Sequence, residues 1–142
     1  MADELLRIPR PIAEKIIEHC IEGRPNEACG ILATKDGEVV EVFKMTNASA
    51  SPMRYSLDPK EQFAMYRKLD DEGWDLGGIF HSHTRTEAYP SPTDVRLANE
   101  EVPHLIVSVA EDPASIRAFR ILKDNWTDEG GDIVEISVVL DG

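Results

Sequence analysis

The feature that most constrains the fold is a predicted β-hairpin in the first third of the chain, "CGILATKDGEVVEVFKMT". Two runs rich in β-branched and apolar residues flank Asp36-Gly37, a dipeptide that tolerates the positive φ angles of a tight hairpin turn. The pattern predicts strands near residues 29–35 and 38–46. Any fold of this chain must therefore accommodate these two strands as antiparallel neighbours.

Helical patterns lie on either side of the hairpin. Residues 9–25, "PRPIAEKIIEHCIEGRP", place isoleucines on one face, with prolines at the start and a glycine and a proline at the end, which predicts an amphipathic helix. After a loop, "NASASPM", and a short predicted strand, "RYSL", Asp58 and Glu61 have the spacing of a capping box. A second helix is expected over residues 59–72.

The second half of the chain is predicted to be mainly β-structure. A strand is expected at "WDLGGIFHSH", a helix start with the pattern S-x-x-D at Ser91, and three further strands at "HLIVSVA", "SIRAFRILK" and "DIVEISVVL". No repeat or linker interrupts this order. Because 142 residues suffice for one hydrophobic core and are short for two, we expect a single domain over residues 1–142.

The charge of the chain excludes two classes of partner. A formal net charge of −12 and a pI near 4.7 would repel nucleic acid and anionic membranes, which bind clustered Lys and Arg. The N-terminus, "MADELLRIPRP", lacks a basic segment followed by an apolar one, and no apolar run approaches the length of a membrane span. Two cysteines are too few for a disulfide scaffold. We expect a cytoplasmic protein that binds neither nucleic acid nor membrane.

Two histidines at the end of the strand "WDLGGIFHSH" indicate a metal site. His81 and His83 are two residues apart, so in a strand both imidazoles project from the same face and can reach one ion. Catalytic zinc is commonly held by three N or O side chains, with the fourth position left for water. Asp94, near the start of the next helix, is the obvious third ligand.

Each of these residues also has a structural interpretation. A single histidine at a strand end is often only a polar residue at the rim of the sheet, although the pair weakens that view. Asp94 is also placed to cap the helix that begins at Ser91, a role compatible with binding metal. Glu87 is a rival third ligand, but it lies in the middle of a loop with no feature to fix it.

A zinc hydrolase also needs a proton carrier, because bound zinc lowers the pKa of water but does not deliver its proton to the leaving group. Glu27, in "RPNEACGIL", is the best candidate since it directly precedes an apolar strand. The alternative is a solvated loop glutamate, and composition alone does not choose between the two.

The pattern of Glu27 followed by "HSH", seven residues, Ser91, two residues and Asp94 resembles the signature of the JAMM (MPN+) zinc metalloprotease family. The segments "NEACGIL", "YSLDPKEQF", "GWDLGGIFHSH" and "AYPSPTDVRLA" are similar to its small bacterial members. This resemblance implies a mixed, curved β-sheet between helices, an α/β fold of the cytidine-deaminase-like kind.

The resemblance also implies a role for each matched residue. His81, His83 and Asp94 would bind Zn²⁺, and Glu27 would act as the general acid/base. Ser91 would donate a hydrogen bond to the oxyanion of the tetrahedral intermediate. Ser82 would form hydrogen bonds that hold the ligand residues in position, or would only pack beside them.

The small bacterial members act on ubiquitin-like sulfur-carrier proteins, so the resemblance implies hydrolysis after a C-terminal Gly-Gly, with release of cysteine or a peptide. Two alternatives remain: a non-catalytic scaffold of the same fold, and a peptidase of cell-wall or phage-tail substrates. Whether the chain forms a homodimer is left open.

Two other enzyme classes agree less well with the sequence. A zinc nucleobase deaminase requires H-x-E and P-C-x-x-C ligands, and neither pattern occurs. A cysteine hydrolase would need an exposed Cys29, whereas this residue opens an apolar strand.

Overall fold

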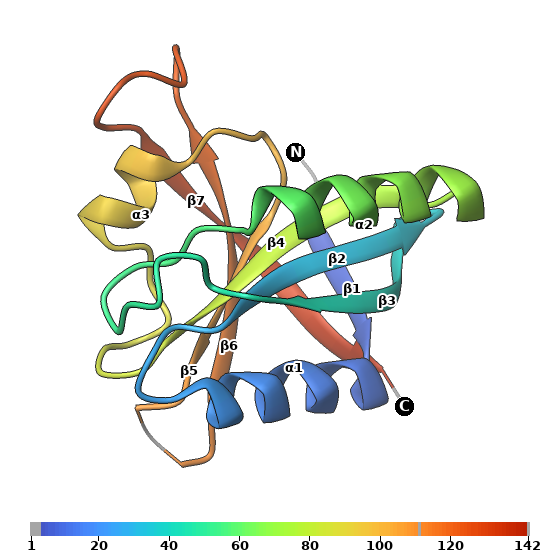
Figure 1. Cartoon of the computed structure of the whole chain (residues 1–142), viewed down its shortest axis with the longest axis horizontal. Helices are drawn as coiled ribbons and strands as arrows, with labels where there is room; N and C mark the ends of the chain where they lie inside the picture. Colours follow the sequence, from blue (N-terminus) through green and yellow to red (C-terminus); the bar gives the residue numbers. More distant parts are fainter. Residues whose placement is uncertain (1–3, 111, 142) are drawn as a thin grey trace.

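The computed structural model describes residues 4–110 and 112–141, which form seven strands and three helices (Figure 1). The elements are β1 Leu5–Pro9, α1 Arg10–Gly23, β2 Cys29–Lys35, β3 Glu38–Met45, α2 Pro59–Glu72, β4 Asp75–His83, α3 Pro92–Leu97, β5 His104–Ser108, β6 Ser115–Leu122 and β7 Asp132–Asp141.

The strands form one mixed sheet that closes on itself in the order β1-β3-β2-β4-β5-β6-β7. Strand β1 pairs in parallel with both β3 and β7, β4 pairs in parallel with β5, and the other neighbours are antiparallel. The expected curved, mixed sheet flanked by helices is confirmed. Its closure was not predicted, because the short segment "LLRIP" that joins the two edges carries little strand signal.

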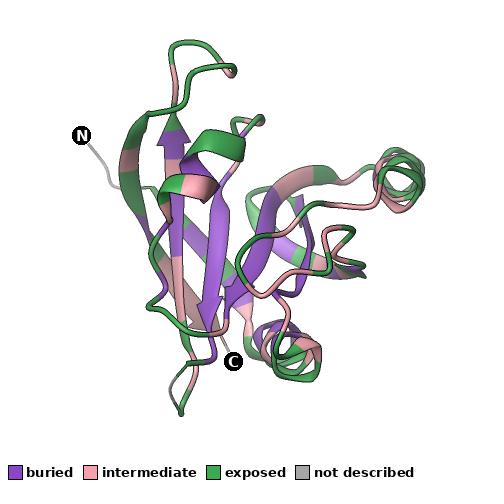
Figure 2. Cartoon of the chain, turned by 60° about the vertical axis from the view of Figure 1, so that its left-hand side comes forward, coloured by how far each residue is buried: buried purple, intermediate pink, exposed green. Residues whose placement is uncertain are grey.

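Two helices cover opposite faces of the β2-β3-β4 part of the sheet (Figure 1). Residues of α1 pack in one cluster with Leu32 and Phe80, whereas Leu69 of α2 packs in another with Ile31 and Ile79. Neighbouring residues of one strand point to opposite faces, so β2 and β4 contribute to both clusters. The central strands are consequently buried while the outer faces of the helices are exposed (Figure 2).

Most of the local structure that short sequence patterns predict is present. The hairpin turn has positive φ at Asp36 and Gly37, of 52° and 81°, and the two long predicted helices form at the expected places. The capping box at Asp58 is only half present. Asp58 accepts hydrogen bonds from the Lys60 and Glu61 amides, but the Glu61 carboxylate binds the Thr46 amide and hydroxyl instead of turning back.

The predicted strand at "RYSL" is wrong. Residues 54–57 form only an isolated bridge between Asn47 and Leu57, because their backbone bonds to the loop that begins at Asn47. Within residues 4–110 and 112–141, no helix has the length and apolar composition needed to cross a membrane.

Candidate metal centre

His81 and His83 lie at the end of β4, which is held on both sides by neighbouring strands. His81 is paired with Cys29 of β2 and with Ile106 of β5, and both imidazoles are almost fully buried, at 1% and 4% exposure. Their Nε2 atoms are 3.3 Å apart. The spacing of two residues has therefore brought both rings to one face, as expected for a strand.

Asp94 reaches the histidines from the first turn of α3. Ser91 caps this helix, since its Oγ accepts from the Asp94 amide at 3.0 Å while Asp94 Oδ2 accepts from the Ser91 amide at 2.9 Å. The same Oδ2 atom lies 3.2 Å from His81 Nε2 and 2.9 Å from His83 Nε2. The reciprocal capping predicted from S-x-x-D is confirmed, and it fixes the carboxylate in front of both imidazoles.

The donor set of these three residues fits zinc. Ligands about 2.0–2.1 Å from a tetrahedral zinc stand roughly 3.3 Å from one another, and the separations here are 2.9–3.3 Å. Burial raises the pKa of Asp94, but hydrogen bonds from the two imidazoles outweigh it and hold that pKa well below its usual range. The carboxylate is thus ionised, the form that binds a cation.

The loop after β4 sets the tautomer of His83. The Nδ1 atom of His83 lies 2.8 Å from the carbonyl oxygen of Glu87, which can only accept, so Nδ1 carries a proton and Nε2 is the atom that would bind a metal ion. Glu87, the rival third ligand, contacts His83 through this backbone carbonyl. The residue as a whole is exposed to solvent. The metal-ligating cluster in the described part of the chain consists of His81, His83 and Asp94.

Tyr55 supports His81, a contact that sequence reasoning missed. The two rings are stacked with centroids 4.4 Å apart and planes at 20°. His81 Nδ1 is buried and has no hydrogen-bond partner among the described residues, so the ring is held by this aromatic contact together with the contact of its Nε2 atom with Asp94. The available signal is an aromatic residue three positions before the α2 cap, in a segment whose composition predicts a strand.

Glu27 precedes β2 and lies beside the cluster because β2 runs antiparallel to β4. Cys29 pairs with His81, and the Ala28 carbonyl accepts from the Ser82 amide at 3.0 Å, so continuing this register places Glu27 opposite His83. Glu27 is 5% exposed, and its Oε1 is buried without a partner among the described residues. Burial and the negative charge of Asp94 raise the pKa of Glu27 to about 8, although His83 opposes this shift.

Ser82 and Ser91 occupy different parts of the site. Ser82 points away from the metal-ligating atoms, and its Oγ accepts a 2.8 Å hydrogen bond from the Ala28 amide, next to Glu27. Ser91 is half-buried, and its Oγ accepts from the Asp94 amide while its own hydroxyl proton remains available for donation. The roles that the family resemblance implies for these two serines stay predictions.

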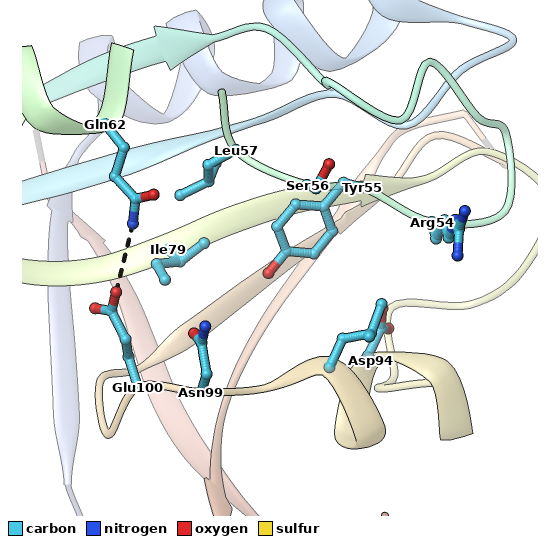
Figure 3. Close-up of a pocket in the computed structure, with 10 residues that line it drawn as sticks. Arg54, Tyr55, Ser56, Leu57, Gln62, Ile79, Asp94, Asn99 and Glu100 are labelled. Atoms are coloured by element: carbon cyan, nitrogen blue, oxygen red, sulfur yellow. Dashed lines mark hydrogen bonds between the residues drawn. The ribbon is translucent and has the colours of Figure 1, made fainter. Parts of the chain in front are cut away.

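A pocket of about 260 Å³ opens beside the metal-ligating cluster. Asp94 and Tyr55 line one part of it, Leu57 and Ile79 line its apolar wall, and Glu100 lies at the far end, where Gln62 donates to its carboxylate (Figure 3). An extended segment could thus reach the cluster along a partly apolar surface.

The cysteines do not form a nucleophilic site. Both are fully buried, and burial raises the pKa of Cys20 and of Cys29 to about 12. Thiols in such surroundings stay protonated at neutral pH, so the cysteine-hydrolase alternative is not supported.

A family model described as prokaryotic homologs of the JAB domain matches residues 9–122. The chain is 38% identical over 135 residues to a CysO-cysteine peptidase of Mycobacterium tuberculosis, with 92% of each protein covered. It is 34% identical over 116 residues to a probable TtuB-protein conjugate cleaving protease of Thermus thermophilus, covering 81% of this chain and 75% of that protein.

Solved structures give the same fold. The solution structure of protein DSY2949 from Desulfitobacterium hafniense matches with a TM-score of 0.84 and 33% identity, covering 96% of this chain and 92% of that one. The crystal structure of AF2198, a JAB1/MPN domain protein from Archaeoglobus fulgidus, matches with a TM-score of 0.58 over 98% of this chain and all of that one. At 18% identity, this second likeness concerns the fold alone.

Proposed function

The chain belongs to the family of prokaryotic homologs of the JAB domain, and from this we propose that it is a zinc-dependent peptidase of ubiquitin-like sulfur-carrier proteins. Its substrate would be a carrier extended past a C-terminal Gly-Gly, and its product the bare carrier together with cysteine or a peptide. We further propose that residues 1–142 form one peptidase domain.

The observation that carries this proposal is the convergence of three buried ligand atoms next to a buried carboxylate that is not used as a ligand. His81, His83 and Asp94 supply the metal-ligating atoms, and Glu27 lies beside them with an unpaired oxygen. Burying a carboxyl group without a hydrogen-bond partner costs folding free energy, so such groups are concentrated at functional sites. A scaffold would gain nothing from this arrangement.

When bound, zinc would polarise the scissile carbonyl and acidify a water molecule. Glu27 would accept the proton of the attacking water at Oε1 and later deliver it to the leaving amine. Ser91 would donate from Oγ to the carbonyl oxygen as negative charge develops on it. The burial of the site excludes bulk water, which strengthens each of these interactions.

The substrate class rests on two supports. The similar proteins from Mycobacterium tuberculosis and Thermus thermophilus are named for cleaving CysO-cysteine and TtuB-protein conjugates. In addition, the pocket beside Asp94 would hold an extended tail, with Tyr55 and Ile79 close to its backbone. Glycines before the scissile bond would let the chain approach these walls without a Cβ clash.

Ser91→Ala is expected to lower kcat by roughly 10²-fold or more while shifting the melting temperature only slightly. Loss of an oxyanion donor has the first effect, whereas loss of a helix cap costs about 1 kcal/mol of stability. Steady-state kinetics and thermal melts on the zinc-loaded protein measure both. A variant that melts much earlier but turns over normally would show that Ser91 acts only as a cap.

The proposed substrate is tested with a sulfur-carrier protein extended past its Gly-Gly. We expect the enzyme to trim it to the bare C-terminus, as followed by mass spectrometry, and we expect a change of the last glycine to alanine to abolish trimming. A free peptide with the same tail should react far more slowly, because it lacks the docking contacts of the folded carrier. Equal rates for peptide and carrier, or indifference to the alanine, would contradict this specificity.

A further inference from the structure

The side chain of Asn47 joins the loop of residues 47–57 to the backbone of Glu27. Its Nδ2 donates to the carbonyl oxygens of Glu27 at 2.9 Å and Arg54 at 3.0 Å, with a longer contact of 3.4 Å to Ser51. Its Oδ1 accepts from the amides of Ser49 at 3.0 Å and Ser56 at 3.1 Å. One carboxamide therefore connects four parts of the backbone at normal hydrogen-bond lengths.

The hydrogen-bonding capacity of this side chain is fully used. An asparagine has two donor hydrogens and an oxygen with two lone pairs, and each finds a partner here. The orientation of the amide is fixed by chemistry, since carbonyls can only accept and backbone amides can only donate. Such a saturated group holds an irregular loop in one conformation where no strand pairing does so.

The bonds on either side of Glu27 come from different elements. The Glu27 amide donates to the Ser51 carbonyl at 2.9 Å, and the Glu27 carbonyl accepts from Asn47, so both bind the 47–57 loop. The next amide, of Ala28, donates to Ser82 of β4. Glu27 is thus held between the loop and the strand that carries the two histidines.

The same loop holds Tyr55. Asn47 binds the carbonyl of Arg54 and the amide of Ser56, the residues on either side of Tyr55, whose ring stacks on His81. Tyr55 lines the pocket beside Asp94 (Figure 3). Asn47 therefore fixes both the backbone next to Glu27 and the backbone on either side of Tyr55.

We infer that Asn47 is a positioning residue for the reaction, acting through Glu27. This inference rests on the proposed function, because it concerns where the proton-carrying carboxylate is held. Asn47 is neither one of the metal-ligating residues nor part of the lining of the pocket beside them. Its contribution is to keep Glu27 within the short distance over which proton transfer is efficient, and displacement by about 1 Å can cost roughly 10²-fold in rate.

The main test is Asn47→Asp on the zinc-loaded enzyme. Aspartate can still accept hydrogen bonds from the Ser49 and Ser56 amides, so the backbone turn at these residues should be kept. It cannot donate to the carbonyls of Glu27 and Arg54, and its second carboxylate oxygen would repel them. The bond that holds Glu27 is therefore lost. We expect kcat to fall by about 10- to 100-fold, with unchanged zinc content. In a Glu27→Gln background the same change should cost less than about 3-fold, because residues that act as a unit are not additive.

Ser49→Ala is the matched control in the same loop. It removes only the contact between the Ser49 and Ser56 hydroxyls, and its kcat should stay near that of the wild type. A fall comparable to that of Asn47→Asp would mean that general loosening of the loop, and not the bond to Glu27, lowers the rate. An equal loss from Asn47→Asp with and without the Glu27 carboxylate would also overturn the inference.

A second measurement needs no substrate, and so separates failure of this inference from failure of the proposed function. In Asn47→Asp, the Glu27 amide should exchange its hydrogen at least about 5-fold faster as its bond to Ser51 loosens, whereas the Ala28 amide, bonded to Ser82, should change little. If Asn47→Asp does not fold, Asn47→Ser serves, since its shorter side chain can accept locally but cannot reach Glu27. Unchanged exchange at Glu27 would refute the anchoring role.

Discussion

Glu27→Gln is expected to keep the fold and zinc while lowering kcat by roughly 10²- to 10⁴-fold. Glutamine has the shape of glutamate but cannot accept the proton of the attacking water. Glu27 lies beside the ligand atoms and is not itself a ligand, so the side-chain amide of the substituted glutamine should leave His81, His83 and Asp94 in place. Steady-state kinetics and metal analysis of the dialysed protein measure the two properties. Loss of zinc in this variant would instead identify Glu27 as a ligand.

The metal-free protein gives an independent check on the burial of Glu27. Its pKa is raised from 4.5 to about 8, so between these values the folded state holds a proton that the unfolded state has lost. Stability should therefore fall as pH rises from 4.5 to 8 in the wild type, by at most about 5 kcal/mol from this group. Glu27→Gln should lack that decline. Melting curves in a chelator, compared across this range, would contradict the assignment if the two proteins lost stability in parallel.

Asp94→Ala is expected to abolish zinc retention and, with it, activity. It removes the charged ligand atom that faces both imidazoles, so the loss of affinity should exceed the roughly 10- to 100-fold that follows removal of an outer partner of a ligand. Metal content after dialysis measures this effect. His81→Ala should give the same result, and retention of about one zinc per chain in both variants would refute the site.

Asp94→Asn is the matched control for the helix cap. Its amide oxygen can still accept from the Ser91 amide, so α3 should keep most of its stability, whereas Asp94→Ala should lose about 1 kcal/mol. Both variants should bind zinc poorly. Zinc loss only in the alanine variant would trace the effect to the collapsed cap and not to the missing carboxylate.

The metal-ligating residues could be proposed from sequence because their geometry is local. Two residues of one strand share a face wherever the strand lies, and a serine with an aspartate three residues on caps a helix by itself. Glu27 could be singled out only through resemblance to a family pattern. Its proximity to His83 depends on β2 pairing with β4 in one register, between Ala28 and Ser82, which are 54 positions apart in the sequence.

Other features escaped prediction for the same reason. The strand β1 is five residues long and is stabilised by its neighbours β3 and β7, so its own sequence contains little evidence for it. Residues 54–57 have the composition of a strand, yet their backbone bonds to the Asn47 side chain instead of a sheet. Tyr55 was therefore expected in a strand, and its contact with His81 was not expected at all.

The sequence by itself determined the features that depend only on residues close together in the chain. These are the hairpin at Asp36-Gly37, the two long helices, the placement of His81 and His83 on one face of their strand, and the cap that orients Asp94. Only the tertiary structure decided the closure of the sheet, the burial that raises the pKa of Glu27, and the anchoring of its backbone by Asn47. These depend on contacts between residues far apart in the chain, and such contacts form only when the whole sheet assembles and excludes water.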